Sequence, residues 1–143
     1  MASTYPIMDK TKIVHTILPA AITGTTTGAT VDTLGFDGVG FIFTVGTVTT
    51  ADGAGNHYVL TWEEGDASTM SDKATISTGK VAIQGTLTDM KIAATTGDEV
   101  TYTWNYTGAK RYVRAVLTET GTAVGNFAAY VVLSTPRVAP VSN

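Results

Sequence analysis

The 143-residue sequence contains no cysteine, and this absence excludes disulfide bonds, thiolate metal sites and cysteine nucleophiles together. Charged residues are also scarce, at 15% of the chain against about 25% in an average soluble domain. With a net charge of −3, the chain lacks the positive surface that binding to nucleic acid requires, so we expect no nucleic-acid partner. A weakly charged surface favours association, and we expect a protein that docks onto a larger body.

Long apolar runs are missing as well. No window approaches the 18 consecutive apolar residues of a membrane-spanning helix. The first residues lack the basic stretch and apolar run of a secretory signal peptide. We therefore expect a soluble protein that is made in a cytoplasm and has no membrane partner.

Threonine and glycine dominate what is present, with 28 and 15 residues. Threonine is β-branched and favours strands, whereas glycine marks turns and bulges. Short alternating apolar segments lie between clusters of glycine, aspartate and asparagine, which is typical of strands separated by turns. The pattern predicts strands at residues 12–17, 38–48, 56–63, 78–84, 99–106, 110–119 and 123–133, with a further short strand near 29–32.

Seven or eight short strands with a turn about every ten residues predict an all-β fold, an antiparallel β-sandwich or jelly roll. The loops at 50–56 and 120–122 predict two hairpins between successive strands. We predict one domain over residues 11–133, with extended arms at 1–10 and 134–143. Pro136 and Pro140 place the second arm outside the sheet, because proline cannot donate to a β-ladder.

Residue patterns that support catalysis are absent from the sequence. His15 and His57 are far apart, while a zinc site needs three or four clustered ligands. Neither a nucleophile-elbow motif nor a phosphate-binding glycine loop occurs. Glu63 and Glu64 are adjacent, so in a strand they point to opposite faces and cannot act as a facing acid–base pair. We expect a protein that is not an enzyme and has no catalytic residue, metal or cofactor.

Four loop aspartates, Asp32, Asp52, Asp66 and Asp72, have two interpretations. Calcium takes six to eight oxygen ligands, which acidic loops can supply, but no complete calcium-loop motif is present. Asx turns, in which the carboxylate accepts nearby backbone N–H groups, explain these aspartates more simply.

Alternating aromatic residues also have two interpretations. They could form an exposed platform that stacks sugars, or they could fill the core of a sandwich, which we favour. The residues concerned are Tyr58, Trp62, Tyr102, Trp104 and Tyr106.

Positive charge is concentrated only at Lys110, Arg111 and Arg114. These cations could pair with Asp98 and Glu99 at the edge of a strand, or they could contact an acidic neighbouring protein. The C-terminal arm could dock on a neighbouring subunit, because its valines would otherwise be exposed. The candidate protein-contact residues are therefore Lys110, Arg111, Arg114, Pro136, Arg137, Val138, Pro140 and Val141.

Residues 105–114 read Asn-Tyr-Thr-Gly-Ala-Lys-Arg-Tyr-Val-Arg. This stretch resembles a Tyr-x-Gly-x-Lys-Arg-Tyr-Val-Arg segment of small structural proteins of tailed bacteriophages, which are often encoded beside the major capsid protein. Residues 37–39, 62–69 and 131–137, followed by Pro140, are similar to that family too, so the resemblance spans roughly residues 31–140. A Ser-Asp-Asp-Gly turn of the family reads Glu-Gly-Asp-Ala at 64–67, which leaves the shape of this loop open.

The resemblance implies a capsid decoration protein, also called a cement protein, with a jelly-roll-like sandwich. Such a protein would sit on the virion surface and bind the major capsid protein and itself, as a homotrimer or another homo-oligomer. The alternatives are a tail or head–tail connector component, or a carbohydrate-binding β-sandwich module.

Overall fold

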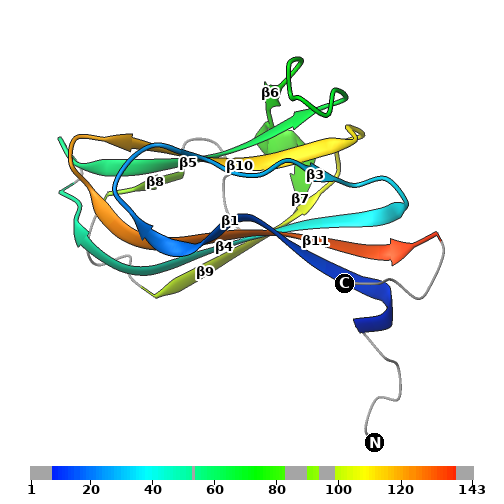
Figure 1. The fold of residues 1–143 in the computed structure, drawn as a ribbon, viewed down its shortest axis with the longest axis horizontal. Coiled ribbons are helices and arrows are strands. Elements are labelled where there is room, and N and C mark those ends of the chain that lie inside the picture. Colours follow the sequence, from blue (N-terminus) through cyan, green and yellow to red (C-terminus); the bar gives the residue numbers. More distant parts are fainter. Residues whose placement is uncertain (1–7, 53, 83–89, 94–98, 138–143) are drawn as a thin grey trace, which may run out of the picture.

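The computed structural model describes residues 8–52, 54–82, 90–93 and 99–137, which form two antiparallel sheets packed face to face (Figure 1). Sheet A has the order β1 (Thr11–Ile22), β11 (Val124–Pro136), β4 (Phe36–Thr50), β9 (Val100–Tyr106) and β7 (Val81–Ala82). Sheet B has the order β2 (Thr26–Thr27), β10 (Tyr112–Thr120), β5 (His57–Gly65) and β6 (Ala74–Thr75), with β3 (Val31–Asp32) beside β10 and β8 (Met90–Ile92) beside β5. Two 3-10 turns, η1 (Met8–Lys10) and η2 (Thr78–Lys80), precede β1 and β7. The predicted all-β antiparallel sandwich is confirmed.

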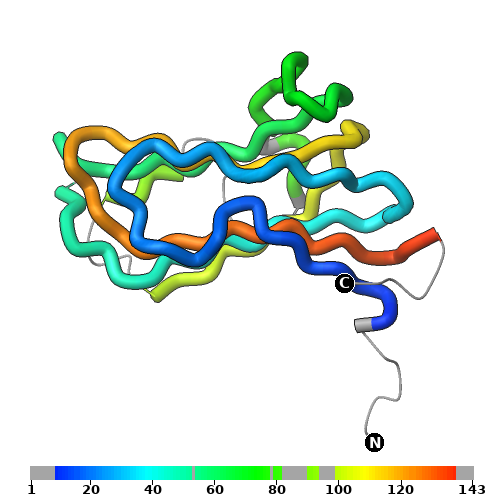
Figure 2. Tube along the Cα trace, viewed as in Figure 1, coloured from blue at the N-terminus to red at the C-terminus, as the bar shows by residue number. Residues whose placement is uncertain are grey.

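The connections from β1 to β2, from β4 to β5 and from β10 to β11 each carry the chain from one layer to the other at the same end of the sandwich (Figure 2). The predicted hairpins at 50–56 and 120–122 are therefore wrong, because β4 pairs with β11 and β9 while β5 pairs with β10. Crossing between layers places the apolar faces of successive strands opposite one another. Tyr58 on β5 thereby packs edge-on against Phe127 on β11, with ring centroids 4.9 Å apart.

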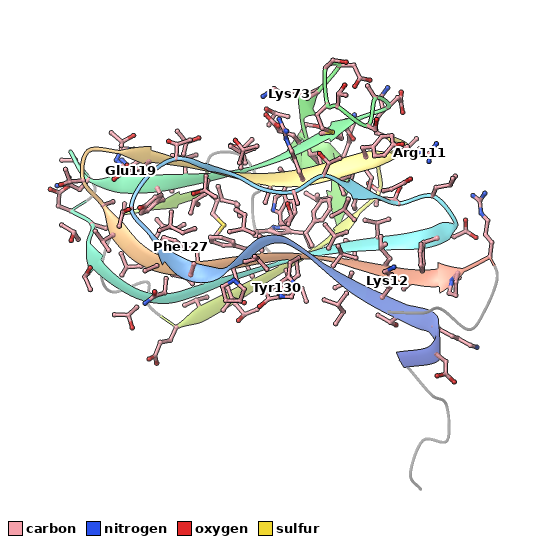
Figure 3. All side chains as sticks on the ribbon, in the orientation of Figure 1. Lys12, Lys73, Arg111, Glu119, Phe127 and Tyr130 are labelled. Atoms are coloured by element: carbon pink, nitrogen blue, oxygen red, sulfur yellow. The ribbon has the colours of Figure 1, made fainter. Side chains whose placement is uncertain are left out.

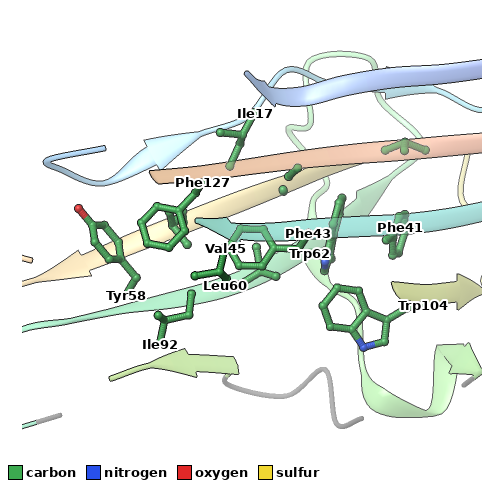
Figure 4. Packing of buried hydrophobic residues seen from close by; sticks show 14 of the residues in the cluster. Ile17, Phe41, Phe43, Val45, Tyr58, Leu60, Trp62, Ile92, Trp104 and Phe127 are labelled. Carbon is green, nitrogen blue, oxygen red and sulfur yellow. The ribbon is translucent and has the colours of Figure 1, made fainter. Parts of the chain in front are cut away.

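The core consists of the side chains at every second position of the strands, which point inward as the alternating pattern predicted (Figure 4). Phe41 of sheet A stacks on Trp62 of sheet B with ring centroids 4.2 Å apart. Trp104 is 3% exposed and Tyr102 packs partly buried against the same cluster. The core interpretation of the alternating aromatics is confirmed, and these residues form no exposed platform.

Thr16, on β1 of sheet A, forms hydrogen bonds that link this edge of the sandwich to β10 of sheet B. The buried Thr16 hydroxyl accepts the Ala115 N–H at 3.1 Å and donates to the Ala29 carbonyl at 2.8 Å. Beside it, the Gly28 N–H donates to the Ala115 carbonyl at 2.8 Å. One side chain of sheet A thus satisfies backbone groups on the opposite layer.

The end of β11 corrects the predicted boundary of the C-terminal arm. Ser134 pairs with Gly38 and Pro136 pairs with Phe36, so residues 134–136 belong to the sheet. Because β1 begins at Thr11, opposite Ser134, β4 is the one strand among the described residues that pairs with β11 beyond that point. A proline is tolerated where one side of a strand is free. At the other terminus, residues 8–10 form η1, and residues 1–7 and 138–143 lie outside the described part of the chain.

Among the residues that the structure describes, no helix has the length and apolar character needed to cross a membrane.

The connection from β4 to β5 is held by one carboxylate. Asp52 accepts the N–H groups of Ala54, Gly55 and Asn56 at 3.1, 3.0 and 2.9 Å, and also the side-chain amide of Asn56 at 2.8 Å. This confirms the Asx-turn interpretation for Asp52. The bonds favour the charged carboxylate, above all the one from the backbone N–H of Asn56, and they lower the pKa of Asp52 from 3.8 to about 2.

Replacing Thr16 by valine keeps the shape of the side chain but leaves the buried Ala115 N–H without its partner and removes the bond to the Ala29 carbonyl. We expect Thr16→Val to lower the free energy of unfolding by about 1–3 kcal/mol, measured by urea denaturation. The same substitution at exposed Thr103 on β9 should change it by less than about 0.5 kcal/mol. Equal effects at the two sites would contradict the bridging role of the hydroxyl.

Asp52 also predicts a pH dependence. A carboxylate whose pKa falls on folding stabilises the native state above its unfolded pKa of 3.8, and this contribution is lost as the pH falls through about 2. Wild type should therefore exceed Asp52→Asn in urea midpoint above pH 4, and the two should converge towards pH 2. A difference that is constant with pH would refute this contribution.

Candidate protein-contact site

Tyr106 lies in the segment that resembles phage structural proteins, and its hydroxyl donates to the Glu64 carboxylate across the core. Glu64 is 1% exposed and also binds the ammonium group of Lys80. The Tyr106 hydroxyl accepts the N–H of Lys110 at 3.2 Å, which ties the β9–β10 loop to the same centre. Burial, and then the bond to Glu64, raise the pKa of Tyr106 well above its ordinary value. Tyr106 is therefore a neutral hydrogen-bond donor at physiological pH.

The next two cations pair with aspartates of other loops. Arg111 donates two hydrogen bonds to Asp32, from Nε to Oδ1 at 3.0 Å and from Nη2 to Oδ2 at 2.7 Å. Lys110 binds Asp66. The predicted pairing of these cations with Glu99 is wrong, and Asp98 lies outside the described residues. Arg111 immediately precedes β10, so its side chain ties the β9–β10 loop to the end of β3.

Arg114 lies on the outer face of sheet B, away from the other two cations. Its Nε binds Glu63 at 2.7 Å, and Lys73 binds the other oxygen of Glu63 at 3.1 Å. Glu63 thus faces outward while its neighbour Glu64 faces the core. The predicted opposition of these two carboxylates is confirmed.

The remaining loop aspartates also serve the backbone. Asp72 accepts the N–H groups of Asp66 and Ala67 at 2.8 and 3.1 Å, which closes the loop whose shape the sequence left open. Asp32 accepts the Leu34 N–H at 2.9 Å while it pairs with Arg111. The Asx interpretation therefore holds for Asp32, which accepts the N–H two residues on. It is wrong for Asp72, whose bonds come from residues five and six positions earlier in the chain, and Asp66 acts as an ion-pair partner.

Three of the predicted contact residues meet at one end of the sandwich. Lys110, Arg111 and Arg137 line a hollow of about 310 Å³, together with the apolar side chains of Leu34 and Phe36. Arg137 binds Asp37 at 2.9 Å. Pro136 ends β11 nearby, whereas the predicted contact residues Val138, Pro140 and Val141 lie outside the described part of the chain.

The charged residues of this site stabilise the fold through ion pairs within the chain. Each of the four cations that the sequence singled out within the described residues already has a carboxylate partner in its own chain. His15 lies on β1 of sheet A and His57 on β5 of sheet B. Across the described ranges, no group of three or more histidine, cysteine, aspartate or glutamate residues is placed to hold a metal ion.

Sequence reasoning found the cations but missed their partners. Asp32 and Arg111 are 79 positions apart, and Asp66 and Lys110 are 44 apart. In the sequence, Asp32 and Asp66 stand out only as loop aspartates, which does not reveal their cation partners.

No protein-family model matches the chain, and no curated protein matches it.

Gly108 allows Tyr106 to reach Glu64, since a Cβ at this position would lie 2.3 Å from atoms of the Tyr106 ring. We expect Gly108→Ala to displace the ring and destabilise the fold by roughly 1–3 kcal/mol in urea denaturation. Gly55→Ala is the matched control, because a Cβ there meets no atom within 4 Å. A neutral Gly108→Ala would show that the Tyr106 contact does not organise the segment.

Proposed function

We propose that this chain is a non-enzymatic virion protein that binds the outer surface of a tailed-phage capsid and stabilises the shell. The proposal begins from the resemblance of residues 105–114 to phage structural proteins. Its partners would be the major capsid protein and further copies of the chain, assembled after synthesis in the host cytoplasm.

One observation carries the proposal: the resembling segment has a coherent structural role. Tyr106, Gly108, Lys110, Arg111 and Arg114 each contribute to the packing or the ion pairs that join loops and strands of the sandwich. A motif whose residues all act in the fold marks a shared architecture better than a chance match of five surface residues would. This structural role of the segment is the support that we offer for the proposal.

The physical properties of the chain suit a bracing role. A shell carries many copies, so a modest contact made by each copy adds up through multivalency to a large total stabilisation. Rigid loops help, because a surface that is already ordered loses little conformational freedom on binding. The ion pairs at the strand ends and the loops that Asp52 and Asp72 hold supply this order.

The test is a titration of undecorated capsid shells with the purified chain. We expect the shells to bind the chain up to a fixed number of copies and to rupture at a higher temperature once saturated, as measured by sedimentation and a dye-release melt. Gly55→Ala, which keeps the fold, should behave like wild type. Shells that bind no chain, or that bind it without any rise in rupture temperature, would refute the proposal.

A further inference from the structure

On four neighbouring strands of sheet A, the described residues that point outward include no aspartate, glutamate, lysine or arginine. These outward positions follow from the register of the four strands, β1, β11, β4 and β9. We call this surface the sheet A face; its residues are Thr11, Ile13, His15, Asn126, Ala128, Tyr130, Val132, Ser134, Gly38, Gly40, Ile42, Thr44, Gly46, Thr101, Thr103 and Asn105. Tyr130 points away from sheet B on this side of the molecule (Figure 3). None of the sixteen is aspartate, glutamate, lysine or arginine, in a chain whose net charge is −3.

The outer face of sheet B is different. The ion pairs of Glu63 with Arg114 and Lys73 cross it from β10 to the loop before β6. Both faces consist of the alternate residues of each strand that point away from the core. The contrast therefore lies in which residues occupy the outward positions, and only the sheet A face is free of charge.

The sheet A face has both a trough and a ridge. A hollow of about 380 Å³ lies beside Gly38 and Gly40 of β4, bounded by Val132 and Asn105; at Gly38 the Ser134 hydroxyl takes the place of a side chain. Glycine weakens the interior of a strand and often marks a place where another backbone approaches closely. Beside the trough, the His15 and Tyr130 rings lie 4.8 Å apart, and Ile13 is 47% exposed.

We propose that two copies of this chain associate through their sheet A faces about a two-fold axis, the ridge of each filling the trough of the other. A contact of this kind uses the same patch twice, so the patch must contain both the projection and its receptor. It must also be free of charge, since any charge near the axis would face its own copy. The sheet A face meets both conditions. This inference is independent of the proposed capsid role.

The size of the face limits the strength of such a pair. The face takes nine residues from each of β4 and β11, about 30 Å at roughly 3.3 Å per residue, and five from each of β1 and β9, about 16 Å. With strands roughly 4.8 Å apart, each copy offers roughly 450 Å² in projection, and the pair would bury about 900 Å². Interfaces below about 1,200 Å² in total are typical of weak, transient contacts, so we expect a reversible dimer of low affinity.

Sedimentation equilibrium of the full chain tests the proposal. Wild type should reach the mass of two chains as concentration rises. Ile42→Lys and Thr103→Lys each place a charge in the contact and should raise the dissociation constant at least about tenfold. Thr103 is already exposed, so its variant keeps the test valid if Ile42→Lys fails to fold.

Val116→Lys on the outer face of sheet B is the matched control and should dimerise like wild type. A wild-type chain that is still monomeric at about 1 mM would overturn the proposal. So would an assembly of three chains, or a dimer that Val116→Lys breaks and Thr103→Lys leaves intact. If the wild-type chain is a monomer and Thr103→Lys fails to bind shells, the sheet A face contacts the capsid and not a second copy of the chain. Shell binding by wild type is measured separately, so the two proposals can fail independently.

Discussion

The structure depends on burying one side of each strand between two sheets. Phe43 and Phe127 stack within sheet A, and Phe127 meets Tyr58 of sheet B edge-on, so a single aromatic cluster joins both layers. Without cysteine, and with few charged residues, this apolar contact is the main source of stability in the chain. The connections that cross between the layers are a consequence of it, because they bring the inward faces of successive strands together.

Polar groups stabilise this core where strands end. The phenol of Tyr58 lies within hydrogen-bond distance of the Ile22 and Ala123 carbonyls, at 2.7 and 2.8 Å, where two connections cross at one end. At the other end, Glu64 holds Tyr106 and Lys80, and the loops around it are fastened by Arg111 and Lys110. The cations that stood out in the sequence as contact candidates therefore form ion pairs that fix the fold.

Much of the fold could be predicted from alternation, and its failures have physical causes. The range 38–48 falls within β4, and 99–106 nearly coincides with β9. Both were predicted well because apolar and polar residues that alternate over seven or more positions strongly indicate a strand. Strands β2, β6 and β8 have two or three residues and show no period. Alternation also identifies the inward side of a strand without revealing its layer, so β4 and β5 were wrongly joined as a hairpin.

The candidate site was less predictable for the same reason. Ion pairs such as Arg111 with Asp32 join residues that are distant in sequence, so no local pattern predicts them. The residues of the uncharged sheet A face can be read from the sequence as alternate positions of β4 and β11. They are recognised as one surface only when these strands are known to be neighbours. Topology, rather than residue type, was the missing information.

Hydroxyl-radical footprinting of the full chain over a range of concentrations tests the division between the two faces most directly. Tyr130 and His15 report on sheet A, and Tyr112 reports on the outer side of sheet B. Oxidation of Tyr130 and His15 should fall as the protein associates, while oxidation of Tyr112 stays constant. Protection of Tyr112 with Tyr130 unchanged would contradict the assignment of contact to the uncharged face.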